Sequence, residues 1–248
     1  MDFSFARFQP VSISFGGPLT PVVRRLLWAN GLVFLLEVLL FSLPEGNLRY
    51  ALMVHVLGLV PARVLGQGWV WQVGTYMFLH EVTTLFHLLW NMLMLWMFGG
   101  EIERVWGGRA FLRYYLITGV GAGLTVLAVT PGSPVPTIGA SGALFGLLLA
   151  YGMIFPNRVL YIFMVVPMRA KWVVVFSGLV TLYSLLTARG GGISHLAHLG
   201  GLVVGWLYLK RVWRVRQLIA EMRWSWRRRR FRVYGDEGGR DRRDPWIH

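Results

Sequence analysis

Six apolar runs, each close to the length of a membrane-spanning helix, constrain this chain more than any other feature of its sequence. The hydrocarbon core of a bilayer is about 30 Å thick and an α-helix rises about 1.5 Å per residue, so a span needs about 20 apolar residues. Only 15% of the 248 residues are charged, whereas an ordinary soluble domain has about 25%. We therefore predict an all-α membrane protein built as a six-transmembrane-helix bundle. The predicted spans are residues 24–43, 83–102, 110–129, 139–155, 171–188 and 194–212.

The basic residues predict the orientation of these spans. Cytoplasmic segments of membrane proteins carry an excess of Lys and Arg. All of the 25 Lys and Arg residues except Arg49, Arg63 and Arg189 fall in segments that lie on one side of the predicted bundle. We therefore expect the N and C termini to be cytoplasmic. The N-terminal segment, residues 1–23, lacks the pattern of a cleavable signal peptide, so we expect the first span to be retained. Spans two, four and six then run in the same direction, and their first turns lie near the outer face.

The net charge of +14 is concentrated after Leu209, where 13 basic residues lie. In a soluble protein such a charge would suggest a nucleic-acid partner. Here it follows the last predicted span, so we expect residues 213–248 to form a basic, partly disordered cytoplasmic tail and expect no nucleic-acid binding. Its Arg227–Arg230 run is expected to contact anionic lipid headgroups, at about 1 kcal/mol per basic residue near the surface.

Polar side chains gather in the first turns of spans two, four and six. They are His87 and Asn91, then Ser141, then His195 and His198. Polar groups in hydrocarbon are costly and face the bundle interior or a water-filled cavity. The alternative is a structural role in interhelical hydrogen bonds, on the order of 0.6 kcal/mol each. Because groups from three helices converge at one depth, we interpret them as a functional site.

The spacing of these residues predicts how they meet. His87 and Asn91 are four residues apart, so both lie on one helix face, about 6 Å apart along the axis, and can donate to one point. In span six, glycines three and seven residues after His198 leave a groove without side chains beside it, and in span four Gly142 and Gly146 form a small-xxx-small pair. Close approach of these helices would bring Ser141 within hydrogen-bonding reach of His198, as a nucleophile and its base require.

The residues that are missing from the spans exclude other protease classes. An intramembrane aspartyl protease needs two Asp residues within the membrane, and a zinc protease needs His-Glu-x-x-His. The nearest approach to the zinc motif, residues 80–84, ends in Thr, and the chain has no Cys. A serine–histidine dyad without an acid remains. The four Asp residues, all outside the predicted spans, are Asp2, Asp236, Asp241 and Asp244.

Four motifs resemble those of the rhomboid intramembrane serine proteases. They are residues 139–146 (Gly-Ala-Ser-Gly-Ala-Leu-Phe-Gly), residues 197–205 (Ala-His-Leu-Gly-Gly-Leu-Val-Val-Gly), His87-x-x-x-Asn91, and the Gly/Glu/Gly motif of residues 99–107. The resemblance runs from about Trp69 to about Leu209. It implies that residues 24–212 form a rhomboid protease domain, with residues 44–82 as a membrane-associated first loop and a water-filled cavity open to the outside.

The resemblance also implies an activity. Ser141 would attack the scissile carbonyl of a single-span membrane protein substrate and form an acyl-enzyme, while His198 takes the proton and delivers it to the leaving amine. His87, Asn91 and the backbone N–H of Ser141 would hold the oxyanion. The resemblance implies no metal and no organic cofactor. We expect a multi-pass protein of a bacterial inner membrane, embedded in the lipid bilayer.

Two positions depart from the family pattern, one residue competes for an assigned role, and one acid has no assigned partner. Trp71-Gln72 stands where the family often has Trp-Arg, and Phe145 stands where many members have a Tyr packed on the catalytic His. His195 competes with His198 as the base, although the glycine spacing favours His198. Glu37 is an acid within the first span that should pair or become protonated.

Two other functions fit parts of the sequence. A rhomboid-like protein could bind membrane clients without cutting them, although the loss of Ser or His that would mark it is not seen. A small transporter or channel would also place polar residues inside a bundle, but it would not need Ser141 and His198 to act as a pair.

Overall fold

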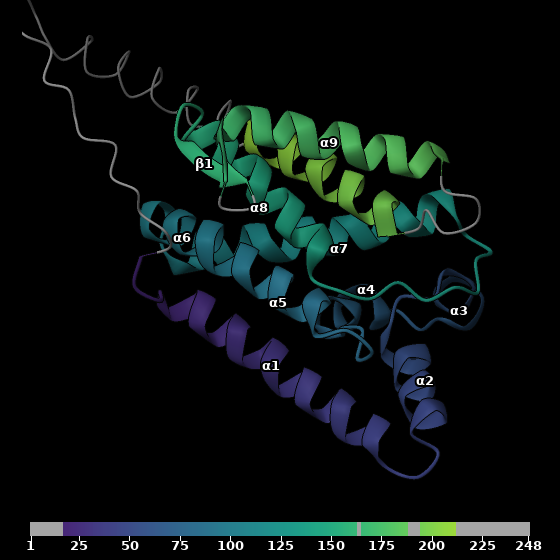
Figure 1. Ribbon diagram of the computed structural model, residues 1–248. Coiled ribbons are helices and arrows are strands. Elements are labelled where there is room, and N and C mark those ends of the chain that lie inside the picture. Colours follow the sequence, from purple (N-terminus) through teal and green to yellow (C-terminus); the bar gives the residue numbers. More distant parts are fainter. Residues whose placement is uncertain (1–16, 163–164, 188–193, 212–248) are drawn as a thin grey trace, which may run out of the picture. The chain divides into compact units, whose positions relative to one another are not determined.

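A computed structural model describes residues 17–162, 165–187 and 194–211, and this part of the chain is mostly helical (Figure 1). Its elements in chain order are α1 (Pro21–Ser42), α2 (Gly46–Leu57), α3 (Pro61–Gln67), α4 (Gln72–Thr75), the 3-10 turn η1 (Tyr76–Phe78), α5 (Leu85–Met94), the π-helical turn η2 (Leu95–Gly99), α6 (Gly100–Trp106), α7 (Gly108–Val129), α8 (Ser141–Ile154), β1 (Val159–Ile162), β2 (Val166–Arg169) and α9 (Ala170–Thr187). A further helix covers residues 194–211. The chain divides into two compact units, residues 1–208 and 209–248, and of the second only the end of this helix is described. The predicted cytoplasmic tail therefore lies outside the described residues.

Four helical segments are long and apolar enough to cross a bilayer. They are α1, the continuous segment Leu85–Trp106 formed by α5, η2 and α6, then α7 and α9. Their bounds lie within a few residues of the predicted spans, so the prediction of an integral, mostly helical membrane protein is confirmed. The 14 residues of α8 are shorter than a full span of about 20. The six-span count and the orientation of the termini stay predictions.

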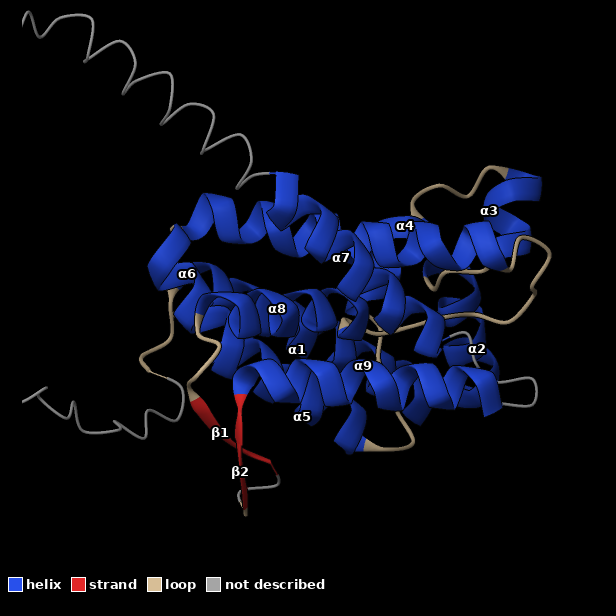
Figure 2. Ribbon diagram, turned by 90° about the horizontal axis from the view of Figure 1, so that it is seen from above, coloured by secondary structure: helices blue, strands red, loops and turns tan. Residues whose placement is uncertain are grey.

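The prediction of an all-α fold is wrong between α8 and α9, where β1 and β2 form an antiparallel hairpin. Val159 pairs with Arg169, and Ile162 pairs with Val166. Figure 2 shows the hairpin, in red, leading into α9 and projecting to one side of the helices. The sequence here is rich in β-branched and aromatic residues, which favour strands, but it lies between the predicted spans 139–155 and 171–188, and we predict no strand for it.

Among the described helices of ten or more residues, α8 has the largest share of buried residues. Nine of its 14 residues are buried, compared with four of 22 in α1 and three of 18 in α9. In Figures 1 and 2 it lies among the other helices, and it packs against α7, α9 and η2. Glycines permit this close packing: a Cβ on Gly146 would lie 2.6 Å from Thr118 Cβ of α7, and a Cβ on Gly152 would lie 2.5 Å from Val174 Cγ2 of α9. The burial of α8 places its first residue, Ser141, in the interior of the bundle.

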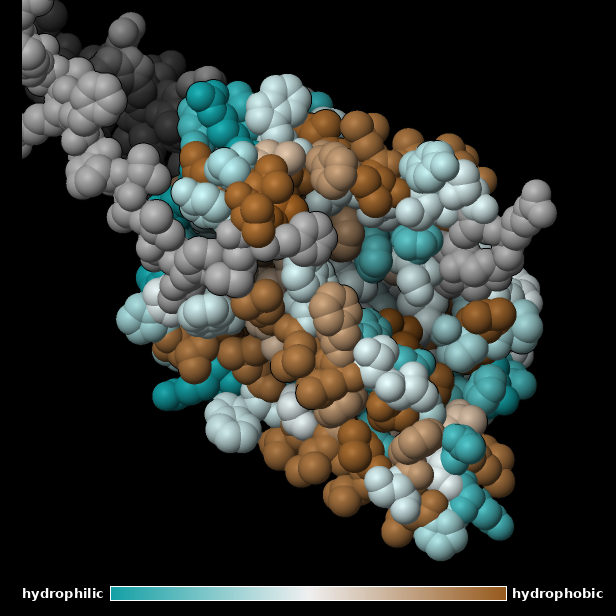
Figure 3. Space-filling view, in the orientation of Figure 1, coloured by the Kyte–Doolittle hydropathy of each residue, from teal (hydrophilic) through white to brown (hydrophobic). Residues whose placement is uncertain are grey.

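The outer helices expose large apolar side chains, the reverse of a soluble protein. Figure 3 shows hydrophobic side chains across much of one face. Since exposed apolar patches larger than a few hundred Å² are rare on soluble monomers, this surface fits hydrocarbon as its solvent. The exposed apolar residues of α1 and α9 are Trp28, Leu32, Leu35, Leu36, Leu39, Trp172, Val175, Phe176, Leu179, Val180, Leu182, Tyr183 and Leu186.

The Gly/Glu/Gly motif of residues 99–107 joins three helices. Glu103 of α6 accepts hydrogen bonds from the backbone N–H groups of Val22 (3.0 Å) and Val23 (2.9 Å) at the start of α1. A carboxylate satisfies the unpaired N–H groups of a helix N-terminus and its positive dipole end. Gly107 has φ +79°, a conformation that favours glycine, and makes the turn from α6 into α7. The motif is therefore structural, and it anchors α1 against α6.

The segment expected as a membrane-associated first loop, residues 44–82, is largely helical and contains α2, α3, α4 and η1. Gln72, which stands where the family often has Arg, is fully buried. Its Oε1 accepts from the N–H of Val60 (2.9 Å), and its Nε2 donates to the carbonyl of His55 (2.8 Å). A neutral amide that both donates and accepts therefore joins the end of α2 to the chain that leads into α3.

Candidate active site

Ser141 and His198 lie within hydrogen-bonding distance of each other. Ser141 begins α8, and His198 lies in the helix of residues 194–211. The Ser141 Oγ and the His198 Nε2 are 2.7 Å apart, which is a normal length for a hydroxyl that donates to an imidazole nitrogen. Both residues are half-buried. This geometry allows His198 to take the hydroxyl proton when Ser141 attacks an electrophile.

Direct backbone packing between the two helices brings this pair together. A Cβ on Gly201 would overlap the carbonyl oxygen of Gly142 and would lie 2.9 Å from its carbonyl carbon. One helical turn further, a Cβ on Gly205 would lie 3.4 Å from the Cα of Gly146. The close approach expected from the glycine spacing is therefore present.

The imidazole of His198 is held by stacking. The Phe145 ring lies parallel to it, with centroids 4.3 Å apart and an interplanar angle of 6°. Among the described residues, His198 forms no ion pair with a carboxylate. Stacking on Phe145, rather than an ion pair with a carboxylate, therefore holds this ring in the described structure. Phe145 keeps the ring contact expected at this position, without a hydroxyl.

His195 lies further from the nucleophile. Its ring meets that of His198 edge-on, with centroids 6.0 Å apart, and its ring nitrogens form no hydrogen bond with Ser141 in the described structure. Of the two histidines, His198 is therefore the one placed to act as the base.

His87 also reaches this site. A Cβ on Gly139 would lie 2.9 Å from the His87 Nε2 and 3.8 Å from the Ser141 Oγ, so the imidazole passes closely over Gly139 beside the serine. Gly139 has φ +115°, a conformation in which other residues are strained. A glycine at this position therefore permits the turn and also leaves room for the His87 ring. The backbone N–H of Glu81 donates to the other ring nitrogen, Nδ1, at 3.2 Å.

Asn91 is placed differently from the expectation that it aims at the same point as His87. Its side chain is 2% exposed, and its Nδ2 donates to the carbonyl of His87 one turn back (2.7 Å). The Asn91 Oδ1 is buried without a hydrogen-bond partner among the described residues. The amide carries a second hydrogen, so Asn91 keeps one donor, but the side chain is committed to its own helix.

Two buried residues outside the predicted site, His80 and Glu37, lie next to each other, and His80 contacts His87. His80 is fully buried, and its ring is 5.1 Å from that of His87. Burial, followed by the neighbouring His87, lowers the pKa of His80 from 6.5 to about 4. Glu37 of α1 is also fully buried, and both its oxygens lie 3.1 Å from the backbone nitrogen of His80. In the sequence, Glu37 is recognisable as an acid within an apolar span. Its partner is the backbone amide of His80, which no residue pattern reveals.

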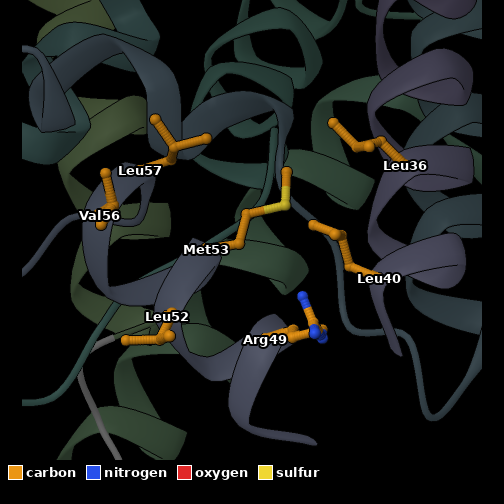
Figure 4. A pocket seen from close by; sticks show the side chains of 7 residues that line it. All are labelled: Leu36, Leu40, Arg49, Leu52, Met53, Val56 and Leu57. Carbon is orange, nitrogen blue, oxygen red and sulfur yellow. The ribbon is translucent and has the colours of Figure 1, made fainter. Parts of the chain in front are cut away.

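A separate pocket of about 470 Å³ lies between α1 and α2. Figure 4 shows its lining side chains, which are apolar apart from Arg49. None of the predicted site residues lines it, and it holds no pair of groups suited to proton transfer. The lining residues are Leu36, Leu40, Arg49, Leu52, Met53, Val56 and Leu57.

Comparison with known proteins identifies the family. The family model described as Rhomboid domain matches residues 67–215, more than half of the chain. The chain therefore belongs to the rhomboid family, as the motifs indicated.

Individual relatives have low sequence identity to this chain, and they include bacterial and mitochondrial proteins. The chain is 28% identical to "Putative rhomboid protease YdcA" of Bacillus subtilis over 76% of its own length and 87% of that protein. It is 31% identical to "Rhomboid protein 1, mitochondrial" of Saccharomyces cerevisiae and 34% identical to "Rhomboid protease GluP" of Bacillus subtilis. These two matches cover 49% and 46% of the chain but only 36% and 22% of the relatives. Since relatives include mitochondrial proteins, a bacterial inner membrane stays a prediction.

Proposed function

We propose that this chain is an intramembrane serine endopeptidase that cleaves transmembrane or membrane-anchored proteins through Ser141 and His198. The observation that carries the proposal is the 2.7 Å distance between the Ser141 Oγ and the His198 Nε2. Membership of the rhomboid family and relatives that bear the name rhomboid protease support it.

The reaction would proceed through an acyl-enzyme. The Ser141 Oγ attacks the scissile carbonyl carbon while the His198 Nε2 takes its proton; collapse of the tetrahedral intermediate breaks the C–N bond, and the same proton goes to the leaving amine. Water then enters and attacks the ester carbon while the His198 Nε2 takes one of its protons; collapse of the second tetrahedral intermediate breaks the ester C–O bond, releases the new carboxyl end and returns that proton to the Ser141 Oγ. Neither half of the cycle calls on a metal or an organic cofactor.

The negative charge of the tetrahedral intermediate would lie at the start of α8. The first N–H groups of a helix have no partner within it, and its positive dipole end attracts an anion. The N–H of Ser141 is one of these groups, and the His87 Nε2 lies over Gly139, two residues earlier in the chain. We assign His87 and the Ser141 N–H as oxyanion donors, with Asn91 contributing its remaining amide hydrogen. Loss of one such donor typically costs about 2.7 to 4 kcal/mol.

The proposed domain covers residues 24–212, with six spans and both termini in the cytoplasm. Residues 1–23 and 213–248 would be cytoplasmic, and the basic tail would contact anionic headgroups. The expected substrates are single-span membrane proteins.

Two variants and one control test this function. Ser141→Ala and His198→Ala should each abolish cleavage of a single-span reporter protein in liposomes and labelling by a fluorophosphonate probe, with unchanged thermal unfolding. His195→Ala should retain measurable activity, because among the described hydrogen bonds the Ser141 hydroxyl pairs with His198 and not with His195. Cleavage by His198→Ala together with inactivity of His195→Ala would reverse the base assignment. Folded wild-type protein that binds the reporter but is neither labelled nor active would instead support a non-proteolytic, client-binding rhomboid-like protein.

A further inference from the structure

The buried acid of α1 lies at one end of a short chain of hydrogen bonds that ends at the active site. Glu37 is fully buried, and its carboxyl oxygens accept the backbone N–H of His80. An ionisable group inside a spanning segment is expensive and marks a function by default. No part of the proposed reaction uses this acid.

The peptide segment that Glu37 holds is also tied to α2. The hydroxyl of Tyr50 donates to the carbonyl of His80 at 3.1 Å. The side chain of His80 is fully buried beside His87. His80 is therefore held by its N–H, its carbonyl and its ring, and the next residue along the chain, Glu81, has its position set by His80.

The N–H of Glu81 then determines which nitrogen of His87 carries hydrogen. It donates to the His87 Nδ1 at 3.2 Å. A neutral imidazole has one N–H and one acceptor nitrogen, and the bond at one nitrogen sets the state of the other. Because Nδ1 accepts, Nε2 carries the hydrogen. Nε2 is the nitrogen that lies over Gly139 beside the serine, so the imidazole presents a donor to the site.

We propose that Glu37 is a positioning residue: by holding the peptide of His80, it aims the Glu81 N–H at the His87 Nδ1 and so fixes His87 as an Nε2–H donor. The effect of Glu37 on turnover rests on the proposed function, whereas its effect on the His87 tautomer does not. Without Glu37, the segment that carries Glu81 loses its anchor to α1, and His87 can place its hydrogen on either nitrogen.

Glu103 offers a matched control within the same chain. It is also a buried acid that accepts backbone N–H groups, in this case at the start of α1. It does not contact His80, Glu81 or His87 in the described hydrogen bonds. Its removal frees the start of α1 at Val22 and Val23 and removes none of the hydrogen bonds between Glu37, His80, Glu81 and His87.

The direct test is the tautomer of His87, read by long-range ¹⁵N–¹H NMR of ¹⁵N-histidine-labelled full-length protein in detergent micelles. All samples carry Ser141→Ala, so the readout does not depend on catalysis, and the His87 signals are assigned by their loss in His87→Asn. Ser141→Ala alone should show a hydrogen on Nε2. Glu37→Gln should keep it, because the amide oxygen still accepts from His80. Glu37→Met should give a mixture of tautomers, whereas Glu103→Met should leave the tautomer unchanged.

Kinetics in the chain with Ser141 restored provide the second readout. Removal of one oxyanion donor lowers kcat by about 10²- to 10³-fold. Glu37→Met should lower kcat by up to this factor, with little change in KM. Glu37→Gln should restore most of kcat. A merely structural role would lower stability and leave the tautomer in place.

Two results would overturn the proposal: an unchanged Nε2–H tautomer in folded Glu37→Met, or the same tautomer loss in Glu103→Met. If Glu37→Met fails to fold, two variants of Glu81 replace it in the test. Glu81→Pro removes the backbone N–H that donates to the His87 Nδ1, and Glu81→Ala keeps that N–H. Only the proline variant should lose the Nε2–H form; retention there would equally refute the proposal. An inactive wild type with the expected tautomers would disprove the protease function alone.

Discussion

Replacing Gly201 by alanine tests whether direct helix contact assembles the active site. The added Cβ would overlap the carbonyl oxygen of Gly142 and lie 2.9 Å from its carbonyl carbon, whereas ordinary contacts of such an atom lie at 3.4–4 Å. The carbon contact alone therefore demands a separation of at least 3.4 minus 2.9, or 0.5 Å, and the oxygen demands more. Both opposing atoms belong to the backbone, so no side-chain rotation can relieve the overlap.

The same movement separates the reacting pair. Ser141 directly precedes Gly142, and His198 lies one turn before Gly201, so a shift of that size stretches the 2.7 Å bond between the Ser141 Oγ and the His198 Nε2. Overpacking typically costs about 1–3 kcal/mol in stability. A misplacement of about 1 Å at an active site can cost about 10²-fold in rate. We expect Gly201→Ala to remain folded, to unfold at lower temperature, and to lose about 10²-fold in kcat/KM.

The assay is the initial rate of reporter cleavage in liposomes, beside fluorophosphonate labelling and thermal unfolding. Gly178→Ala in α9 is the control, because its Cβ would lie 3.6 Å from Leu202, an ordinary contact. It should keep wild-type activity and stability. Wild-type turnover in Gly201→Ala would refute the reasoning, since the pair would then be positioned by something other than this contact.

Two further predictions concern the histidines beside this pair. His87→Ala should lower kcat by about 10²- to 10³-fold, and Asn91→Ala by less, because one amide hydrogen of Asn91 is committed to its own helix; unchanged kcat in both variants, measured with substrate binding intact, would remove them from the oxyanion site. Because burial lowers the pKa of His80 to about 4, the unfolded chain takes up a proton below about pH 6.5 that the folded chain does not. Stability should therefore be full above that pH and fall by about 3 kcal/mol as the pH approaches 4. His80→Gln should flatten this dependence in thermal unfolding between pH 4 and 8, and an identical slope in that variant would assign it to other groups.

Local patterns predicted much of the fold. Hydropathy located the first span at residues 24–43 and the fifth at residues 171–188, where the structure has Pro21–Ser42 and Ala170–Thr187. This works because the cost of placing a residue in hydrocarbon is nearly additive along the chain. The hairpin of residues 159–169 was not predicted, since a short apolar run between two spans carries no distinctive period.

Part of the candidate site could be predicted because the spacing of residues along one helix is a local property of the sequence. The glycines after His198 indicated a helix face without side chains next to this histidine. The hydrogen bond from the Asn91 amide to the His87 carbonyl also lies within one helix, but which acceptor the amide takes depends on the surrounding packing.

The sequence by itself determined that this chain lies in a membrane, that it belongs with the rhomboid proteins, and that a serine and a histidine are carried on helices able to touch. Tertiary structure alone decided that Glu37 meets the peptide of His80, 43 residues away, and that the Glu81 N–H meets His87. The physical reason is that hydropathy and helical period are carried by side chains in order along the chain. A backbone amide is the same at nearly every residue, so its partner is chosen only when the packed helices bring the two groups together.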